Sequence, residues 1–221
     1  MPNSNSTLLT NGPKDAKSQL LLAHGAGAAM TSPFMEKMAG LLADRGLQVF
    51  RFEFGYMAAR RDGGKRRPPP KAELLMGEYR DVVVAVRRNL KKSQNLLIGG
   101  KSMGGRVASL VADDLYAQDA IAGLVCLGYP FHPPGKPDKL RTAHLIDMHC
   151  PSLIVQGERD PFGHRDEIEA KQLSMAITLQ WADDGDHDLS PRGSSGFTRA
   201  GNLTIAADAI TAFASSLADQ K

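Results

Sequence analysis

The sequence is poor in the residues that mark several special classes of protein. Of its 221 residues only two are cysteine, and 6% are aromatic. Cys126 and Cys150 match neither a metal-ligand nor a redox spacing, and the chain contains no H-E-x-x-H motif. No apolar run approaches the roughly 18 residues that a membrane-spanning helix requires. These absences predict a protein with no metal, no disulfide and no membrane span.

The excess of positive over negative charge is also small, with a formal net charge of +3. This value does not indicate nucleic-acid binding. The first twelve residues are polar and lack the regions of a secretory leader, so we expect a cytoplasmic protein. Basic residues are concentrated between Arg60 and Lys71, where six of them accompany one Asp. This segment is either a solvated loop or a recognition loop for an anionic substrate or partner, in which Arg60 and Arg61 bind substrate.

Short apolar runs alternate with helical patterns along the chain. The runs are continuously apolar, which indicates strands buried on both faces. This order predicts an α/β fold, a doubly wound, mostly parallel sheet with helices on both faces. The predicted strands are residues 19–23, 47–54, 95–99, 121–127, 152–156 and 177–181. The predicted helices are residues 33–45, 72–90, 104–116, 166–173 and 202–217.

The length of the chain fits one domain. We predict a single domain over residues 18–221, preceded by a flexible or reduced N-terminal segment at residues 1–17. Binding sites in such folds lie beyond the carboxyl ends of the strands. The loops that follow the strands are therefore where chemistry is expected.

One of these loops carries the motif G-x-S-x-G. The segment Gly100-Lys-Ser-Met-Gly104 falls between a predicted strand and a predicted helix, which is the context of a nucleophile elbow. The elbow is a sharp turn, and side chains two residues before or after the nucleophile would collide across it. Gly100 and Gly104 avoid that collision, so Ser102 is the predicted nucleophile.

A serine nucleophile needs a base, and the base needs an orienting acid, in the expected chain order Ser, acid, His. Of six histidines, only His187 follows the last predicted strand and precedes the last helix. The acid should follow the preceding strand, where Glu158 and Asp160 compete. We favour Asp160, because its turn also contains Pro161 and Gly163.

Acyl transfer also needs an oxyanion hole, which two backbone N–H groups form in enzymes of this kind. One belongs to the residue after the nucleophile, Met103. The other is expected from the small-residue loop His24-Gly-Ala-Gly27, which follows the first predicted strand, and Ala26 is the candidate.

Two phosphate-binding interpretations compete with the interpretation of Ser102 as a nucleophile. Gly99-Gly-Lys-Ser102 resembles the end of a P-loop, but the first glycine of that motif would fall at Asn95. The segment from Gly25 to Met30 resembles a dinucleotide fingerprint, but Met30 occupies the third glycine position. Neither interpretation uses the acid and the histidine at their strand ends, so we expect no cofactor.

The chain resembles the α/β-hydrolase superfamily from residue 19 to its final helix. Within it, four segments resemble a little-characterised, dienelactone-hydrolase-like branch that includes the testis-expressed hydrolase-like proteins, subunit three of the NSL chromatin complex and many bacterial hydrolases. These segments are residues 56–70, 128–137, 140–145 and 185–187. The resemblance implies a triad of Ser102, Asp160 and His187 and an oxyanion loop at residues 24–27.

The segment after Gly128, where larger relatives carry a helical cap, is only about twenty residues long and rich in proline. It is too short for a lid of several helices. We therefore expect an open, shallow site that prefers short acyl groups, lined by Met30, Met103, Phe162 and Trp181.

The candidate triad of Ser102, Asp160 and His187 predicts a serine hydrolase that cleaves a carboxylic ester or a similar acyl bond of a small molecule. The alternative is a hydrolase-fold interaction module with little or no turnover and a protein partner. The resemblance to a chromatin-complex subunit favours the module, whereas the complete triad favours the enzyme.

Overall fold

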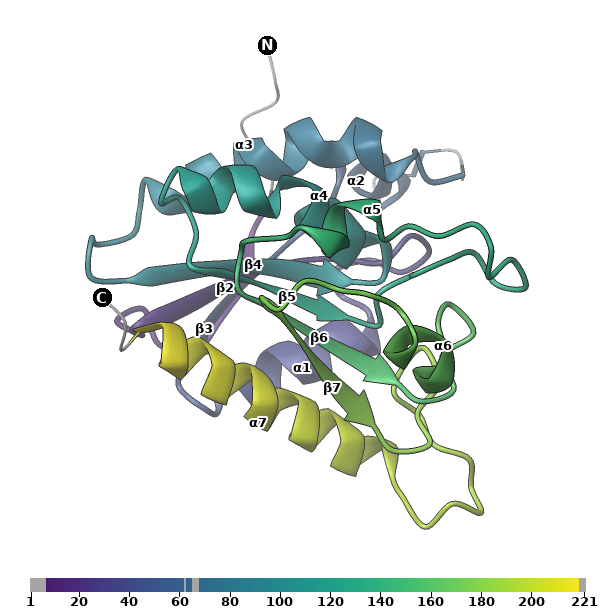
Figure 1. The fold of residues 1–221 in the computed structure, drawn as a ribbon. Coiled ribbons are helices and arrows are strands. Elements are labelled where there is room, and N and C mark those ends of the chain that lie inside the picture. The colour runs from purple at the N-terminus through teal and green to yellow at the C-terminus, as the bar shows by residue number, and fades with distance from the viewer. Residues whose placement is uncertain (1–6, 62, 65–67, 219–221) are drawn as a thin grey trace.

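The computed structural model describes residues 7–61, 63–64 and 68–218 (Figure 1). Part of the basic segment, residues 65–67, therefore lies outside the described residues, as does the start of the predicted N-terminal segment.

Seven strands form a single sheet in the described chain. They are β1 (Leu9–Asn11), β2 (Ser18–Ala23), β3 (Gln48–Phe52), β4 (Asn95–Lys101), β5 (Gly123–Leu127), β6 (Ser152–Gly157) and β7 (Ile177–Ala182). Their order is β1-β3-β2-β4-β5-β6-β7, and every neighbouring pair is parallel except β1 with β3. The chain adds β3 on one side of β2 and β4 to β7 on the other. The predicted doubly wound, mostly parallel sheet is confirmed.

Helices cover both faces of this sheet (Figure 1). They are α1 (Pro33–Ala43), α2 (Gly55–Arg61), the 3-10 helix η1 (Ala72–Leu75), α3 (Met76–Arg87), α4 (Met103–Ala117), α5 (Ala143–Ile146), α6 (Arg165–Glu169) and α7 (Arg199–Ala218). α1 packs beside α7 on one face, and α3 packs beside α4 on the other. The connection through α1 runs one way across the sheet and those through α3 and α4 run the other way. Right-handed crossovers in opposite directions place their helices on opposite faces.

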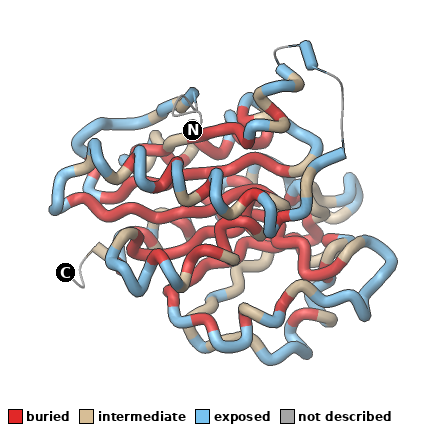
Figure 2. Tube along the Cα trace, turned by 90° about the horizontal axis from the view of Figure 1, so that it is seen from above, coloured by how far each residue is buried: buried red, intermediate tan, exposed pale blue. Residues whose placement is uncertain are grey.

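The interior consists of two apolar layers, one on each face of the sheet. Figure 2 shows the strands as the buried centre and the outer sides of helices and loops as exposed. Phe52 belongs to one layer and Met38 to the other. Every residue of β2, β4, β5 and β6 is buried, which explains the run of apolar residues within each of them. Cys126 and Cys150 are buried, free thiols.

Several elements differ from the prediction. The sequence does not predict β1, α2 or α5, which are only three, seven and four residues long. Such short elements carry no clear hydrophobic period. The helix predicted over residues 72–90 is divided into η1 and α3, and the helix predicted over residues 166–173 ends at Glu169. Between the strand predicted over residues 47–54 and the helix predicted over residues 72–90, the absence of a predicted helix is wrong, because α2 occupies residues 55–61.

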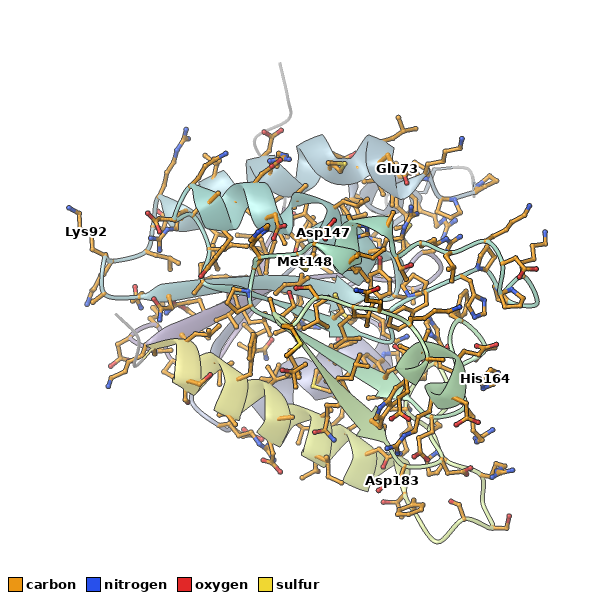
Figure 3. The ribbon with its side chains drawn as sticks, viewed as in Figure 1. Glu73, Lys92, Asp147, Met148, His164 and Asp183 are labelled. Atoms are coloured by element: carbon orange, nitrogen blue, oxygen red, sulfur yellow. The ribbon has the colours of Figure 1, made fainter. Side chains whose placement is uncertain are left out.

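The direction of the strands brings the candidate loops to one edge of the sheet. In Figure 3, Lys92, which precedes β4, lies at one end of the molecule. His164 and Asp183, which follow β6 and β7, lie at the other end. Because parallel strands all point the same way, the loops after β2, β4, β6 and β7 meet at this carboxyl edge.

Candidate active site

Ser102 lies at the junction of β4 and α4. Its backbone has φ 52° and ψ −116°, a conformation that residues other than glycine rarely adopt. A Cβ atom at Gly100 would lie 2.6 Å from the carbonyl oxygen of Ala23, and one at Gly104 would lie 2.5 Å from the same oxygen. A side chain at either position would collide with the backbone, so both positions require glycine, as the G-x-S-x-G motif predicts.

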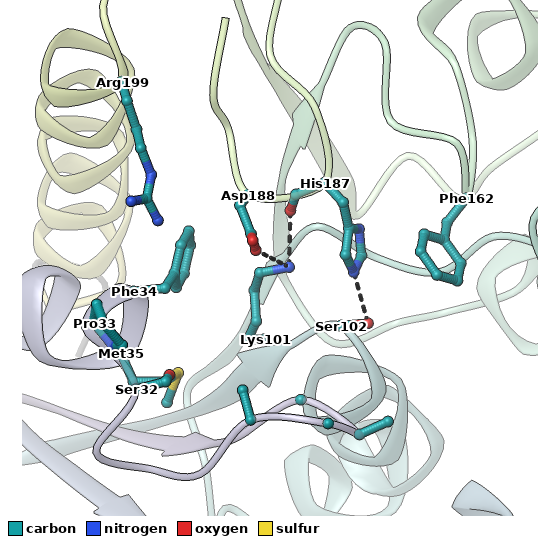
Figure 4. Close-up of a pocket in the computed structure, with 14 residues that line it drawn as sticks. Ser32, Pro33, Phe34, Met35, Lys101, Ser102, Phe162, His187, Asp188 and Arg199 are labelled. Atoms are coloured by element: carbon teal, nitrogen blue, oxygen red, sulfur yellow. Dashed lines mark hydrogen bonds and ion pairs between the residues drawn. The ribbon is translucent and has the colours of Figure 1, made fainter.

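A series of hydrogen bonds joins Ser102 to side chains from two other loops. The Oγ atom of Ser102 lies 2.9 Å from Nε2 of His187, as Figure 4 shows. Nδ1 of the same ring lies 2.7 Å from Oδ2 of Asp160. Asp160 follows β6 and His187 follows β7, and these two strands pair in parallel. The three side chains are thus in the contact expected from their positions after separate strands.

The carboxylate of Asp160 is completely buried and held by further donors. The backbone N–H of Phe162 donates to Oδ1 at 2.8 Å, and Nε2 of Gln156 donates to Oδ2 at 3.0 Å. The ring of Phe162 also lies against the imidazole of His187, with 4.3 Å between the ring centroids. Both the acid and the imidazole are therefore fixed in orientation.

Glu158, the competing acid, has other partners. Its Oε1 atom accepts a hydrogen bond from Arg165 at 2.8 Å, and its Oε2 atom accepts one from the backbone N–H of Asp184 at 2.8 Å. These donors lower the pKa of Glu158 and hold its charge away from His187. The geometry therefore agrees with the choice of Asp160.

The loop after β2 is held by a buried histidine, His24. Its Nε2 atom accepts a hydrogen bond from the N–H of Phe54 at 3.2 Å, so Nδ1 carries the proton and donates to the carbonyl of Gly25 at 2.6 Å. Burial lowers the pKa of His24, which favours this neutral form. The hydroxyl of Tyr56 donates to the carbonyl of Ala26 at 3.0 Å. These contacts fix the backbone of the candidate oxyanion loop.

Two cavities meet at Ser102, Ala26 and Phe162, which line both. The first cavity has a volume of about 510 Å³ and is shown in Figure 4; its other lining residues include Phe34, Met35, Lys101, His187, Asp188 and Arg199. The second cavity has a volume of about 540 Å³, and its other lining residues include Lys71, Glu73, Met103, Arg106 and Arg141. Each volume lies within the roughly 300–1,000 Å³ typical of small-molecule pockets. Both cavities are therefore large enough to hold a small molecule beside Ser102.

The structure does not bring every predicted substrate residue to these cavities. Phe162 lines both of them, and Met103 lines the second. Met30 lines neither, because its side chain is buried in the interior with 2% of the residue exposed. Trp181 also lines neither and instead faces the guanidinium of Arg165, 5.7 Å from the ring centroid. The positions of Met30 and Trp181 therefore do not support their predicted contact with substrate.

Arg60 and Arg61 occupy the last turn of α2 and line neither cavity. Arg61 pairs with Glu53 at 2.5 Å, and the guanidinium of Arg60 lies 5.9 Å from the ring centroid of Tyr56. Both side chains thus contact the chain around the end of β3, and their positions do not support the predicted contact with substrate.

Lys101, the residue immediately before the nucleophile, makes contacts that the sequence analysis does not anticipate. Only 8% of its side chain is exposed, and Nζ donates to the carbonyl of His187 at 2.8 Å (Figure 4). Nζ also pairs with Oδ1 of Asp188 at 3.2 Å. Burial lowers the pKa of Lys101, and the charge of Asp188 opposes that effect. Lys101 therefore ties the end of β4 to the loop of His187, and a lysine inside a buried strand is the signal that points to it.

Two negative findings apply to the residues that the structure describes. Across residues 7–61, 63–64 and 68–218, no group of three or more His, Cys, Asp or Glu side chains is arranged to hold a metal ion. No helix in those ranges is long and apolar enough to cross a membrane.

The doubly wound sheet and the sharp turn after β4 are typical of an α/β hydrolase. Residues 16–215 match the model of a family described as an alpha/beta hydrolase domain, and the chain belongs to this family. The predicted membership in this superfamily is confirmed.

Solved structures agree with this assignment of the fold. An alpha-beta serine hydrolase homologue from Coxiella burnetii has 18% identity and a TM-score of 0.69, with 93% of this chain and 89% of that chain covered. Dienelactone hydrolase from Anabaena variabilis has 21% identity and a TM-score of 0.68, with 93% and 90% covered. Est1E from Butyrivibrio proteoclasticus has 15% identity and a TM-score of 0.66, with 95% and 93% covered.

Proposed function

We propose that this protein is a serine hydrolase that cleaves a carboxylic ester or a similar acyl bond, with Ser102, His187 and Asp160 as its triad. The observation that carries the proposal is the hydrogen-bonded series from the buried Asp160 through His187 to Ser102, which lies where two cavities meet. Membership in the α/β-hydrolase family supports hydrolytic chemistry at this position.

In the first half of the reaction, Ser102 becomes acylated. Nε2 of His187 accepts the hydroxyl proton as Oγ of Ser102 attacks the carbonyl carbon, and Asp160 stabilises the imidazolium that forms. The N–H groups of Met103 and Ala26 stabilise the negative oxygen of the tetrahedral intermediate. His187 then gives its proton to the leaving oxygen as the ester C–O bond breaks.

In the second half, water releases the acyl group. His187 accepts a proton from the water as its oxygen attacks the acyl carbon, and the same N–H groups stabilise the second intermediate. The bond between the acyl carbon and Oγ breaks, and the proton passes from His187 to Ser102. The products are a carboxylic acid and an alcohol, and the enzyme returns to its starting state.

A fluorophosphonate probe is expected to label Ser102. The probe phosphonylates a serine whose proton is removed by a base, so the Ser102→Ala variant should show no labelling. Intact-mass and peptide mass spectrometry measure the extent and the position of the modification. The control is Ser216→Ala, which removes an exposed hydroxyl on α7 and should label like the wild type. Folded wild-type protein that stays unlabelled would contradict the proposal and favour the interaction module.

Lys101→Met is expected to lower kcat/KM by about tenfold to a hundredfold, the equivalent of one or two charge-assisted hydrogen bonds. The variant keeps the length of the side chain but loses the donor to the His187 carbonyl, so the imidazole is held less firmly. Steady-state kinetics and the rate of fluorophosphonate labelling measure the effect, and Tm separates it from unfolding. Lys92→Met, at the opposite end of the molecule, is the matched control (Figure 3). Wild-type kinetics in Lys101→Met would remove this positioning role.

A further inference from the structure

The second cavity, beside Ser102, is lined by an excess of basic side chains. Lys71, Arg106 and Arg141 contribute positive charges to its wall, and Glu73 contributes a negative one. The rest of the wall is uncharged and includes three prolines and the candidate oxyanion residues Ala26 and Met103. None of the four charged side chains takes part in the proton transfers described above. The concentration of positive charge therefore calls for another explanation.

Arg106 lies one helical turn after the nucleophile. Its backbone N–H donates to the carbonyl of Ser102 at 3.0 Å, and only 18% of its side chain is exposed. Nη2 pairs with Oε1 of Glu73 at 2.5 Å, and η1, which carries Glu73, packs against α4. Nε of Arg106 is buried and has no hydrogen-bond partner among the described residues. A buried N–H donor without a partner costs free energy.

Arg141 contributes the second guanidinium and comes from the loop after β5. Its backbone is fixed, because its N–H donates to the carbonyl of Phe131 at 2.7 Å and its carbonyl accepts from the hydroxyl of Tyr129 at 2.9 Å. Within the described part of the chain, no carboxylate forms an ion pair with its guanidinium. Burial lowers the pKa of Arg141, and the charge of Arg106 lowers it further. The two guanidinium groups thus repel each other across a wall that has only one carboxylate.

The first cavity differs in how its charges are neutralised. Nζ of Lys101 pairs with Asp188 and donates to the carbonyl of His187. Arg199 is exposed at the start of α7, where water screens its charge. Pro33, Phe34 and Met35 make one part of its wall apolar. The first cavity therefore suits an uncharged part of a substrate.

We propose that the second cavity binds an anionic group of the substrate, a carboxylate or a phosphate, through Arg106 and Arg141. This inference rests on the proposed hydrolase function and names its substrate class, an acyl compound that carries an oxyanion group near the scissile bond. A planar guanidinium donates two parallel hydrogen bonds to such a group. The oxyanion would reduce the repulsion between the two arginines.

The test compares three esters of 4-nitrophenol. The acyl chain of one ends in a carboxylate, that of another ends in a phosphate monoester, and the third is the uncharged methyl ester of the first. In the wild type, kcat/KM is expected to be about tenfold or more higher for a charged ester than for the uncharged one, as one charge-assisted hydrogen bond provides. Whether the carboxylate or the phosphate is preferred identifies the anion.

Arg141→Gln removes one of the two proposed ligands. It is expected to lower kcat/KM for the preferred anionic ester by about tenfold to a hundredfold and to leave the uncharged ester unchanged. The matched control is Arg80→Gln, which removes an equal charge on the same face of the sheet, where Arg80 pairs with Asp114 at 2.6 Å. Arg80→Gln should affect none of the three esters, and Tm confirms that both variants fold.

Labelling makes the result independent of substrate choice. A fluorophosphonate whose chain ends in a carboxylate should label the wild type faster than its methyl ester, and Arg141→Gln should abolish that difference. Equal rates with charged and uncharged compounds in the wild type, or an equal loss with both in Arg141→Gln, would overturn the inference while leaving the hydrolase intact. Absence of labelling by both probes would instead overturn the proposed function.

Discussion

His187→Ala is expected to lower kcat for ester hydrolysis by about a millionfold, the loss seen when the base of such a triad is removed. Nε2 of His187 lies 2.9 Å from Oγ of Ser102 and is the base that we propose activates it. His24, on the neighbouring loop, does not substitute for it, because its Nε2 atom accepts the hydrogen bond of Phe54. Without a base, the hydroxyl attacks in its weakly nucleophilic neutral form.

Steady-state kinetics on a 4-nitrophenyl ester measure this loss, and circular dichroism establishes that the variant is folded. The control is His149→Ala, because the side chain of His149 is 86% exposed and should not affect kcat. A loss in His187→Ala smaller than about a hundredfold, the lower limit of general-base catalysis, would contradict the role of His187.

Asp160→Asn is expected to lower kcat by about ten-thousandfold, as the loss of the acid does in serine proteases. The carboxylate accepts hydrogen bonds from three donors: Phe162 N–H, Gln156 Nε2 and His187 Nδ1. An amide has only one acceptor oxygen, so its NH₂ group must face one of these donors. If it faces His187, the ring takes the tautomer with the proton on Nε2, which does not accept the proton of Ser102.

The competing acid provides the comparison for this variant. Glu158→Gln should retain activity, because Glu158 is bound to Arg165 and to the backbone of Asp184. Asp166→Asn, an exposed residue in the first turn of α6, is a second control. The opposite result, with activity lost in Glu158→Gln and retained in Asp160→Asn, would reverse the assignment of the acid.

The sheet was predictable because the reason for each strand is local. A strand buried on both faces favours apolar residues at successive positions whatever packs against it, and the central residues of β2, β4 and β6 show this in their sequences. Strand β1 gave no such signal, since it is three residues long and lies at the edge of the sheet. The sequence did not predict α2 either, because this helix is only seven residues long and its last two residues, Arg60 and Arg61, begin the basic segment.

Part of the candidate site could also be predicted from residues that are adjacent in the chain. Gly100 and Gly104 are required by contacts with the carbonyl of Ala23, at the end of the neighbouring strand, which any elbow in this fold would make. The order of Ser102, Asp160 and His187 along the chain follows from loops that leave successive strands at one edge. These residues were therefore identifiable before their distances were known.

The sequence by itself determined the parallel sheet, the sharp turn at Ser102 and the loops that carry Asp160 and His187, because each depends on residues adjacent in the chain. Only the tertiary structure decided which side chains turn toward Ser102. It placed Asp160 against His187 and Glu158 against Arg165, although both carboxylates follow β6. It buried Met30, which lies close to the oxyanion loop in sequence, and brought Arg106 and Arg141 to one cavity from separate segments. Side-chain direction is fixed by packing against distant segments, which no local pattern in the sequence records.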